Sequence, residues 1–166
     1  MIALETDRLV VRTFRLDDWK DLQEYVIQPE VTRYDHEYPH SDEDLQNLVR
    51  FFSDNEGFWA VCLKDTGKMI GHVACVRREP RESRTWHIGF VFNPAYHGRG
   101  YATESCQRVL RRVFADENAR RVESACAAAN APSWKLLERL RLRREADHGD
   151  YYVYGVGADE WAVSDA

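Results

Sequence analysis

The sequence predicts a mixed α/β fold in which helices pack on a mixed sheet. Short apolar runs rich in β-branched and aromatic residues alternate with longer segments whose apolar residues recur every three or four positions. Their order is strand, two helices, three strands, helix, strand, helix and two strands, which indicates one mixed sheet with helices packed on it. With 166 residues, 44% of them hydrophobic, we expect residues 1–166 to form a single domain.

The N-terminal part supplies the first strand and two helices. Residues 7–14 mix β-branched and apolar side chains and predict a short strand, and the stretch 16–26 then predicts a helix. An irregular segment follows at 28–40. Ser41, followed three residues later by Asp44, resembles a capping box before apolar residues at helical spacing, so a second helix is predicted there.

The rest of the chain supplies the sheet and two more helices. The apolar runs 58–63 and 69–76, joined by a turn-rich junction, predict a hairpin, and 84–92 predicts the next strand. Helical periodicity then begins near Ala102 and ends near Phe114. A strand at about 121–127, a helix after Pro132 and a closing hairpin at 142–146 and 151–156 complete the order.

Composition excludes several classes of protein. No apolar stretch approaches the roughly 20 residues of a membrane span, and no leader is evident, so we expect a cytoplasmic protein without a membrane partner. The four cysteines lack CxxC spacing, so no metal site and no disulfide scaffold is expected. A net charge of −5 argues against binding nucleic acid through a basic surface.

Charge is unevenly distributed along the chain. Residues 15–57 carry 12 acidic and 4 basic side chains, a balance of −8, whereas residues 77–144 carry 7 acidic and 15 basic ones, a balance of +8. The two parts therefore suit oppositely charged partners.

The most informative stretch runs from residue 88 to residue 104, where a predicted strand ends and a predicted helix begins. Gly98 and Gly100 bracket Arg99 at this junction. Glycines permit close backbone approach, so N–H groups converge at the helix start without a bulky side chain in front of them, which suits an anionic phosphate group. A simple tight connection is the alternative. The stretch matches neither the P-loop nor a complete GxGxxG pattern.

The string N-P-x-Y-H-G-R-G-Y-A-T-E at 93–104 resembles the acetyl-CoA-binding motif of the GNAT superfamily of N-acetyltransferases, especially its ribosomal-protein N-terminal acetyltransferases. The pattern [QR]-x-x-G-x-[GA] maps onto 97–102, with His97 in place of Gln or Arg. Three further features resemble the subgroup in family order: L-x-T-x-R-L at 4–9, Gly71 after an isoleucine, and N-x-x-S at 130–133.

The resemblance implies a mostly antiparallel sheet whose fourth and fifth strands, here about 85–92 and 121–127, splay apart to receive the pantetheine arm of acetyl-CoA. Backbone groups of Phe90 and Phe92 and the side chain of Asn130 would face that arm. The pyrophosphate would be held by backbone N–H groups of the following residues: His97, Gly98, Arg99, Gly100, Tyr101 and Ala102. The basic balance of 77–144 suits the same ligand.

Acetyl transfer needs a neutral amine and a proton for the departing thiolate. Where the family commonly has a glutamate base, this sequence has His87, whose ordinary pKa suits the role, although a structural histidine is the alternative. Strand alternation places Trp86 and His87 on opposite faces and leaves open which one faces the site. The family's usual tyrosine acid is replaced by Leu137, so Ser133 is the candidate acid, with a helix cap as its alternative role.

The resemblance implies that the early helices and their loops form the acceptor site. The acidic and aromatic residues Tyr34, Asp35, Glu37 and Tyr38 would attract a cationic amine there, and a solvated acidic surface is the alternative. The implied activity is acetyl transfer to a primary amine of a peptide or small molecule, by direct attack in a ternary complex. The competing hypotheses are a catalytically idle acyl-CoA-binding domain and a nucleotide-binding protein. Homodimers are common in the subgroup.

Overall fold

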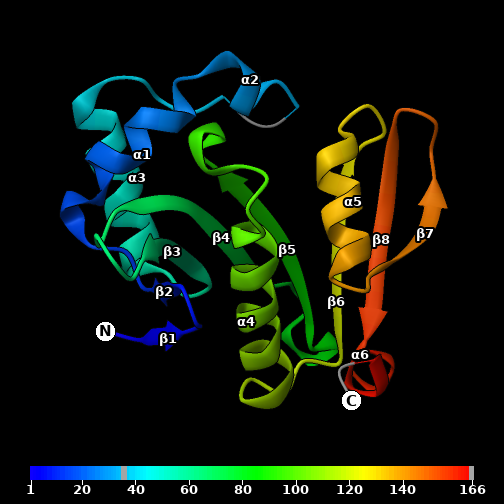
Figure 1. Ribbon diagram of the computed structural model, residues 1–166. Coiled ribbons are helices and arrows are strands. Elements are labelled where there is room, and N and C mark those ends of the chain that lie inside the picture. The colour runs from blue at the N-terminus through cyan, green and yellow to red at the C-terminus, as the bar shows by residue number, and fades with distance from the viewer. Residues whose placement is uncertain (35–36, 165–166) are drawn as a thin grey trace. The chain divides into compact units, whose positions relative to one another are not determined.

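The computed structural model describes residues 1–34 and 37–164. It has the predicted mixed α/β fold with one mostly antiparallel sheet of eight strands in the order β1-β2-β3-β4-β5-β6-β8-β7 (Figure 1). The strands are β1 Ala3–Glu5, β2 Leu9–Arg12, β3 Phe58–Leu63, β4 Met69–Arg77, β5 Thr85–Phe92, β6 Arg121–Ala127, β7 Arg143–Asp147 and β8 Tyr151–Gly157. The helices are α1 Trp19–Val26, α2 Pro29–Thr32, α3 Asp42–Asp54, α4 Tyr101–Ala115, α5 Ala131–Arg139 and α6 Ala158–Ser164.

The described chain divides into two compact units. The first unit comprises 1–74 and 90–109, and the second comprises 75–89 and 110–166, so β4, β5 and α4 each contribute to both. That residues 1–166 form a single domain stays a prediction. No helix of the described residues combines the length and hydrophobicity of a membrane span.

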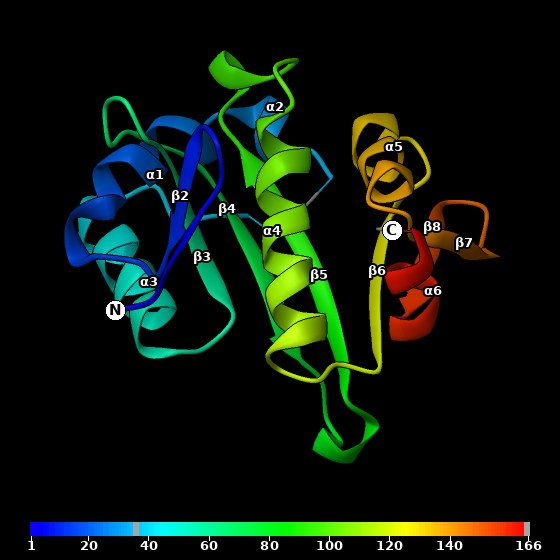
Figure 2. The same ribbon diagram turned by 60° about the horizontal axis from the view of Figure 1, so that its bottom comes forward.

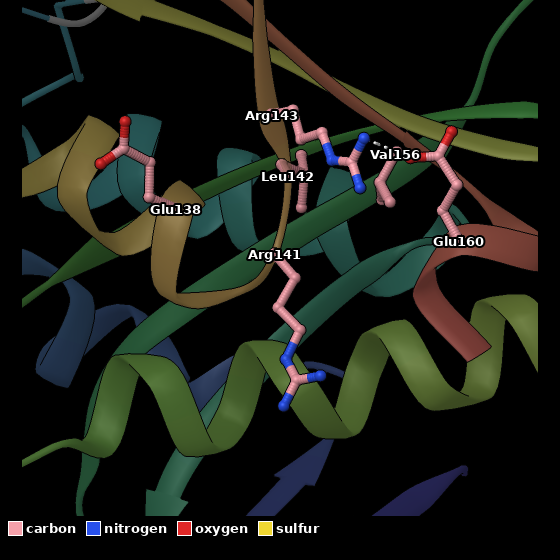
Figure 3. A pocket seen from close by; sticks show the side chains of 6 residues that line it. All are labelled: Glu138, Arg141, Leu142, Arg143, Val156 and Glu160. Atoms are coloured by element: carbon pink, nitrogen blue, oxygen red, sulfur yellow. Dashed lines mark ion pairs between the residues drawn. The ribbon is translucent and has the colours of Figure 1, made fainter. Parts of the chain in front are cut away.

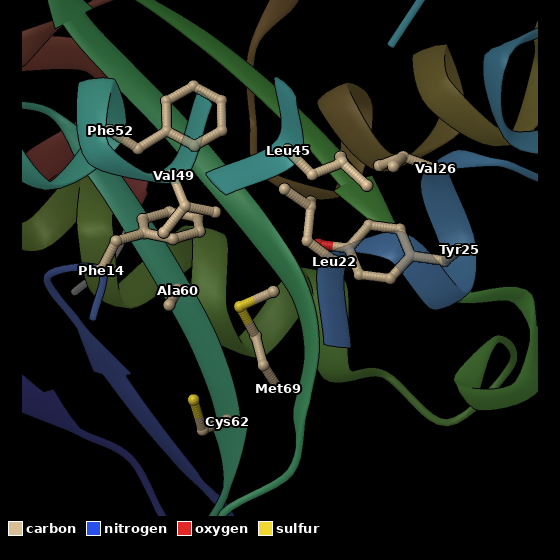
Figure 4. Close-up of a cluster of buried hydrophobic side chains, with 10 residues drawn as sticks. All are labelled: Phe14, Leu22, Tyr25, Val26, Leu45, Val49, Phe52, Ala60, Cys62 and Met69. Carbon is tan, nitrogen blue, oxygen red and sulfur yellow. The ribbon is translucent and has the colours of Figure 1, made fainter. Parts of the chain in front are cut away.

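In the first unit, α1 and α3 lie side by side and cover part of the sheet (Figure 2). Their apolar faces meet β3 and the start of β4 in one core, drawn in Figure 4: Phe14, Leu22, Tyr25, Val26, Leu45, Val49, Phe52, Ala60, Cys62 and Met69. The predicted cap of α3 is confirmed, because the Ser41 hydroxyl accepts a hydrogen bond from the Asp44 N–H at 3.2 Å. Beside the core, the guanidinium of Arg12 donates to both carboxylate oxygens of Asp18 at 2.8 Å.

In the second unit, β8 lies between β6 and β7 and pairs antiparallel with both. The β5–β6 ladder is parallel and joins Thr85–His87 to Arg121–Glu123, although both strands continue beyond it. Where it ends, the Ser124 hydroxyl donates to the Ile88 carbonyl at 2.7 Å. This short ladder agrees with the expected splay of these strands.

Three elements differ from the prediction. The strand expected at 7–14 is present but shorter, as β2, and a further strand, β1, precedes it and was not predicted. A turn at Thr6–Leu9 joins the two, with Thr6 N–H donating to Leu9 O at 3.0 Å. The strands predicted as fourth and fifth are therefore β5 and β6. The segment expected to be irregular contains the one-turn helix α2. Helix α6 was not predicted, and its Trp161 donates to the Leu140 carbonyl at 3.2 Å, a tertiary contact that local pattern does not reveal.

Candidate functional site

The loop between β5 and α4 is held by Asn93 and His97. The Asn93 side chain accepts from the Ala95 N–H at 3.0 Å and donates to the Glu24 carboxylate at 2.6 Å, and the residue is 2% exposed. The His97 ring lies 3.2 Å from the Phe92 carbonyl through Nε2, and its backbone N–H donates to Pro94 O at 3.2 Å. The backbone N–H of His97 is therefore engaged within the loop, and the candidate anion donors begin at Gly98.

The two glycines of the loop occupy backbone conformations that disfavour other residues. Gly98 has φ +75° and Gly100 has φ +80°. A Cβ at Gly98 would meet no atom within 4 Å, so its front is open, and a Cβ at Gly100 would meet only Arg8 at 3.4 Å. The first hydrogen bond of α4 runs from Glu104 N–H to Gly100 O at 3.0 Å. The N–H groups of Gly100, Tyr101 and Ala102 thus lie ahead of the helical ladder, where an anion binds most readily.

The first turn of α4 is tied to the N-terminal turn by Glu104. Its carboxylate accepts from the Thr6 hydroxyl at 2.6 Å, from Arg8 Nε at 2.8 Å and from the Arg8 N–H at 3.1 Å. Burial opposes ionisation of Glu104, but the hydrogen bonds from Thr6 and Arg8 outweigh it and lower its pKa. The Arg8 guanidinium also lies over the Tyr101 ring, 4.4 Å from its centroid. These contacts give the threonine and arginine of L-x-T-x-R-L a role that sequence reasoning missed.

The structure also gives a physical reason for glycine at position 71, which the sequence did not reveal. A Cβ there would overlap Cδ1 of the Phe92 ring, so only glycine admits that ring against β4. The ring holds the end of β5, from which the loop departs. Phe90 is half-buried and Phe92 is buried, and the Phe92 carbonyl is already approached by His97.

The start of α5 carries Asn130 and Ser133, both half-buried. Their backbones are paired: Ser133 N–H donates to Asn130 O at 3.1 Å, and Asn130 N–H donates to Ala127 O at 2.9 Å. The Asn130 side chain makes no capping hydrogen bond. Within the described chain, neither the Ser133 hydroxyl nor the Asn130 amide has a hydrogen-bond partner, so the capping role considered for Ser133 is not observed. Leu137, where the family has a tyrosine, is completely buried.

Of the two neighbours on β5, Trp86 is the buried one, at 3% exposure, and His87 is half-buried on the other face. His87 pairs in register with Glu123, whose carboxylate lies 3.2 Å from Arg78 Nε. Burial, and then the charge of Arg78, lower the pKa of His87, while Glu123 opposes them. His87 is therefore neutral at pH 7, the protonation state that a base requires.

The acceptor candidates lie in the first unit, and Asp35 lies outside the described residues. Tyr34 is 42% exposed, and its ring is 6.0 Å from the guanidinium of Arg33. Glu37 is exposed, whereas Tyr38 is half-buried, and its hydroxyl lies 3.3 Å from Nε2 of the buried His72. The described candidates thus divide between the two units: the loop and the acceptor residues belong to the first, and His87, Asn130 and Ser133 belong to the second.

A pocket of about 280 Å³ in the second unit contains none of these candidates (Figure 3). Its lining consists of Glu138, Arg141, Leu142, Arg143, Val156 and Glu160. Arg143 pairs with Glu160 at 3.4 Å, and the Arg141 side chain points away from that pair. Among the described residues, no group of three or more His, Cys, Asp or Glu side chains is arranged to hold a metal ion.

Residues 8–143 match the family model of the acetyltransferase (GNAT) domain, which covers the loop, β5, β6 and the start of α5. The chain belongs to the GNAT family of acetyltransferases. A curated relative, the uncharacterized N-acetyltransferase YnaD of Bacillus subtilis, is 31% identical over 95% of this chain and 98% of its own length.

Solved structures share the GNAT fold over nearly the whole chain. A GNAT-family acetyltransferase from Bacillus anthracis is 29% identical, covers 96% of this chain and 100% of its own, and has a TM-score of 0.88. A spermidine N-acetyltransferase from Vibrio cholerae, in complex with CoA and spermine, is 16% identical and has a TM-score of 0.80. The match covers 95% of this chain and 99% of that one. Ribosomal-protein acetyltransferases from Vibrio species also have this fold.

Proposed function

We propose that the protein is an acetyl-CoA-dependent N-acetyltransferase that acts on a primary amine by direct attack in a ternary complex. One observation carries the proposal: the turn of Gly98 and Gly100 places backbone N–H groups, with little in front of them, ahead of the first hydrogen bond of α4. This arrangement fits the pyrophosphate of acetyl-CoA, and membership of the GNAT family supplies the ligand class.

The backbone N–H groups from Gly98 to Ala102 hold the pyrophosphate in this proposal, and exposed Arg99 adds positive charge. The side chain of Asn130 and the backbone groups of Phe90 and Phe92 would contact the pantetheine arm. When bound, acetyl-CoA supplies an activated acetyl thioester.

Two side chains of the second unit handle protons in the proposed reaction. Neutral His87 accepts a proton from the amine, directly or through water, because an ordinary alkyl amine is protonated at pH 7. Ser133 donates a hydrogen bond to the departing thiolate. Its hydroxyl has no competing partner in the described chain, which supports that role. The acidic stretch 15–57 would attract the cationic amine, with Tyr34, Glu37 and Tyr38 as the described candidate contacts and Asp35 beside them in sequence.

A second candidate function is an idle acyl-CoA-binding domain. It is favoured by the buried Leu137, which stands where the family usually has the tyrosine that acts as the acid. Release of free CoA thiol, measured with a panel of peptide and small-molecule amines and confirmed by mass spectrometry of the product, separates the two. We expect thiol release that depends on the amine. Calorimetric binding of acetyl-CoA without turnover on any amine would favour the idle domain. A cytoplasmic location and a homodimer stay predictions.

A further inference from the structure

A chain of polar contacts runs from the β3–β4 turn through α1 to the loop before α4, all within the first unit. The Lys68 ammonium donates to Oδ1 of Asp21 and to Oε1 of Glu24, both at 3.0 Å. The second oxygen of Glu24, Oε2, accepts from Nδ2 of Asn93 at 2.6 Å. Oδ1 of Asn93 in turn accepts from the Ala95 N–H at 3.0 Å. Three segments that are far apart in sequence are thus joined to the backbone of the loop.

Lys68 engages one oxygen of the Glu24 carboxylate and leaves the other for Asn93. Burial would lower the pKa of Lys68, but its hydrogen bonds to Asp21 and Glu24 outweigh burial and raise it, so Lys68 is a cation at pH 7. Asp21 is fixed as well, because its Oδ2 accepts from the Met69 N–H at 3.0 Å. The Glu24 side chain is 50% exposed, yet each of its oxygens has a partner that sets its direction.

The carboxylate of Glu24 decides how the Asn93 amide is oriented. A carboxylate only accepts hydrogen bonds, so it must face the NH₂ group of Asn93, and the amide oxygen then faces the Ala95 N–H. Turned over, the amide would set its NH₂ group against that N–H and its oxygen against the carboxylate. Asn93 is 2% exposed, where such lost bonds are costly. Its backbone is held separately, by donation to Ile70 O at 2.8 Å, so the side chain is the part that Glu24 controls.

We infer that Glu24 is a positioning residue of the acetyl-CoA-binding loop and acts through Asn93. The inference rests on the proposed function, because it takes this loop as the acetyl-CoA site. Ala95 lies in the short turn 94–96, and the candidate anion donors begin two residues after it, at Gly98. The orientation of one amide therefore holds the backbone that leads into those donors. Glu24 lies in the acidic stretch 15–57, but its carboxylate serves the loop and not a cationic amine.

Exchanging the two groups tests the hydrogen bond. Asn93→Asp keeps an acceptor for the Ala95 N–H but sets a second carboxylate against Glu24, so acetyl-CoA affinity should fall about tenfold. Adding Glu24→Gln restores a donor–acceptor pair, since the new amide can donate to the new carboxylate while its oxygen accepts from Lys68. We expect this double variant to recover affinity. The matched control adds Glu43→Gln instead, at an exposed carboxylate of α3; it has the same net charge and should recover nothing.

Kinetics and calorimetry separate positioning from a general loss of structure. In Asn93→Asp the loss should appear in KM for acetyl-CoA, with kcat at saturation changed less than about twofold, because the loop binds the cofactor and does not touch the reacting atoms. Calorimetry measures the affinity of each variant for acetyl-CoA directly.

A second readout needs no ligand. In Glu24→Gln, Lys68 retains the oxygen of the new amide, so its NH₂ group faces Asn93 and favours the overturned amide. The Ala95 N–H then loses its acceptor, and its hydrogen exchange, followed by NMR, should become at least about tenfold faster. Glu43→Gln should leave that rate unchanged.

The two readouts can fail independently. A double variant of Glu24 and Asn93 that binds acetyl-CoA no better than Asn93→Asp, or an unchanged Ala95 exchange rate in Glu24→Gln, would overturn the inference. If the wild-type protein does not bind acetyl-CoA, the proposed function fails, and the Ala95 exchange rate by itself decides whether Glu24 orients Asn93.

Discussion

The starts of α4 and α5 both carry residues of the candidate site, but they are built in opposite ways. The start of α4 is fixed by side chains from elsewhere in the first unit, because Glu104 binds Thr6 and Arg8 and Asn93 binds Glu24. At the start of α5, Trp134 donates to the Ala128 carbonyl and packs against Arg144 and Tyr152, but the side chains of Asn130 and Ser133 make no hydrogen bond within the described chain. The backbone N–H groups from Gly98 to Ala102, here called the cradle, must be held in place to bind an anion. The Ser133 hydroxyl, in contrast, must keep its hydrogen available for a reacting atom until the substrate arrives.

The largest expected effect tests the cradle at α4. Gly100→Asp places a carboxylate where the pyrophosphate meets the N–H groups, so acetyl-CoA affinity should fall by at least about 100-fold, equivalent to about 2.8 kcal/mol. Calorimetry on the folded variant measures it. Gly67→Asp is the matched control, because Gly67 also has positive φ and open space but lies in the β3–β4 turn. Undiminished affinity in Gly100→Asp would remove the phosphate assignment.

The next largest effect is expected at the Ser133 hydroxyl, at the start of α5. Ser133→Ala should lower kcat by about 100-fold, a typical contribution of proton donation, with a smaller change in acetyl-CoA affinity. Its unfolding free energy should change by less than about 0.5 kcal/mol. Ser41→Ala is the contrasting control: Ser41 caps α3, so this variant should lose about 1 kcal/mol of stability and keep its kcat. Lost stability with normal kcat in Ser133→Ala would make Ser133 a cap.

A smaller effect, on stability, is expected at Glu104, whose hydrogen bonds with Thr6 and Arg8 hold the start of α4. Glu104→Gln should lower the free energy of unfolding by about 1 kcal/mol at pH 7, since Arg8 is partly exposed and its ion pair is screened. Because the pKa of Glu104 is depressed in the folded state, its contribution is present above the unfolded pKa and is lost as pH falls through the folded value.

Denaturant titrations of wild type and Glu104→Gln should therefore converge in acid. Glu5→Gln, at a carboxylate that is mostly exposed beside Lys64, is the control and should not change stability. A stability difference that persists unchanged below the folded pKa would contradict the role of the ionised carboxylate.

The smallest effect concerns His87 in the second unit. If neutral His87 is the base, the acid limb of the kcat/KM profile lies below the ordinary histidine pKa of 6.5, because burial and Arg78 lower the pKa. Arg78→Gln should move that limb to higher pH, since it removes a positive charge that lowers the pKa of His87 and leaves Glu123 with Arg121 as its ion-pair partner. Arg81→Gln, at an exposed arginine of the same hairpin, should leave the limb in place. An unmoved limb in Arg78→Gln would assign His87 a structural role.

Sequence alone determined the features that depend on neighbouring residues. The periodicity of α3 and its Ser41 cap, the glycine turn before α4 and the strand character of β5 are all local, because each is set by residues a few positions apart. The same local patterns carried the resemblance to the GNAT family. They also predicted α5, but they left Ser133 between two roles, since a capping bond depends on the side-chain rotamer in the folded chain.

Only the tertiary structure decided which side chains meet across long stretches of sequence. Thr6 and Glu104 are 98 positions apart, Tyr25 and His72 are 47 apart, and the Gly71 backbone must admit the ring of Phe92. No local period encodes such pairs, because the packing of the sheet and helices brings them together. Burial has the same origin: it makes Trp86 the inward neighbour of His87, and it lowers the pKa of His72, whose ring nitrogens lie near the hydroxyls of Tyr25 and Tyr38.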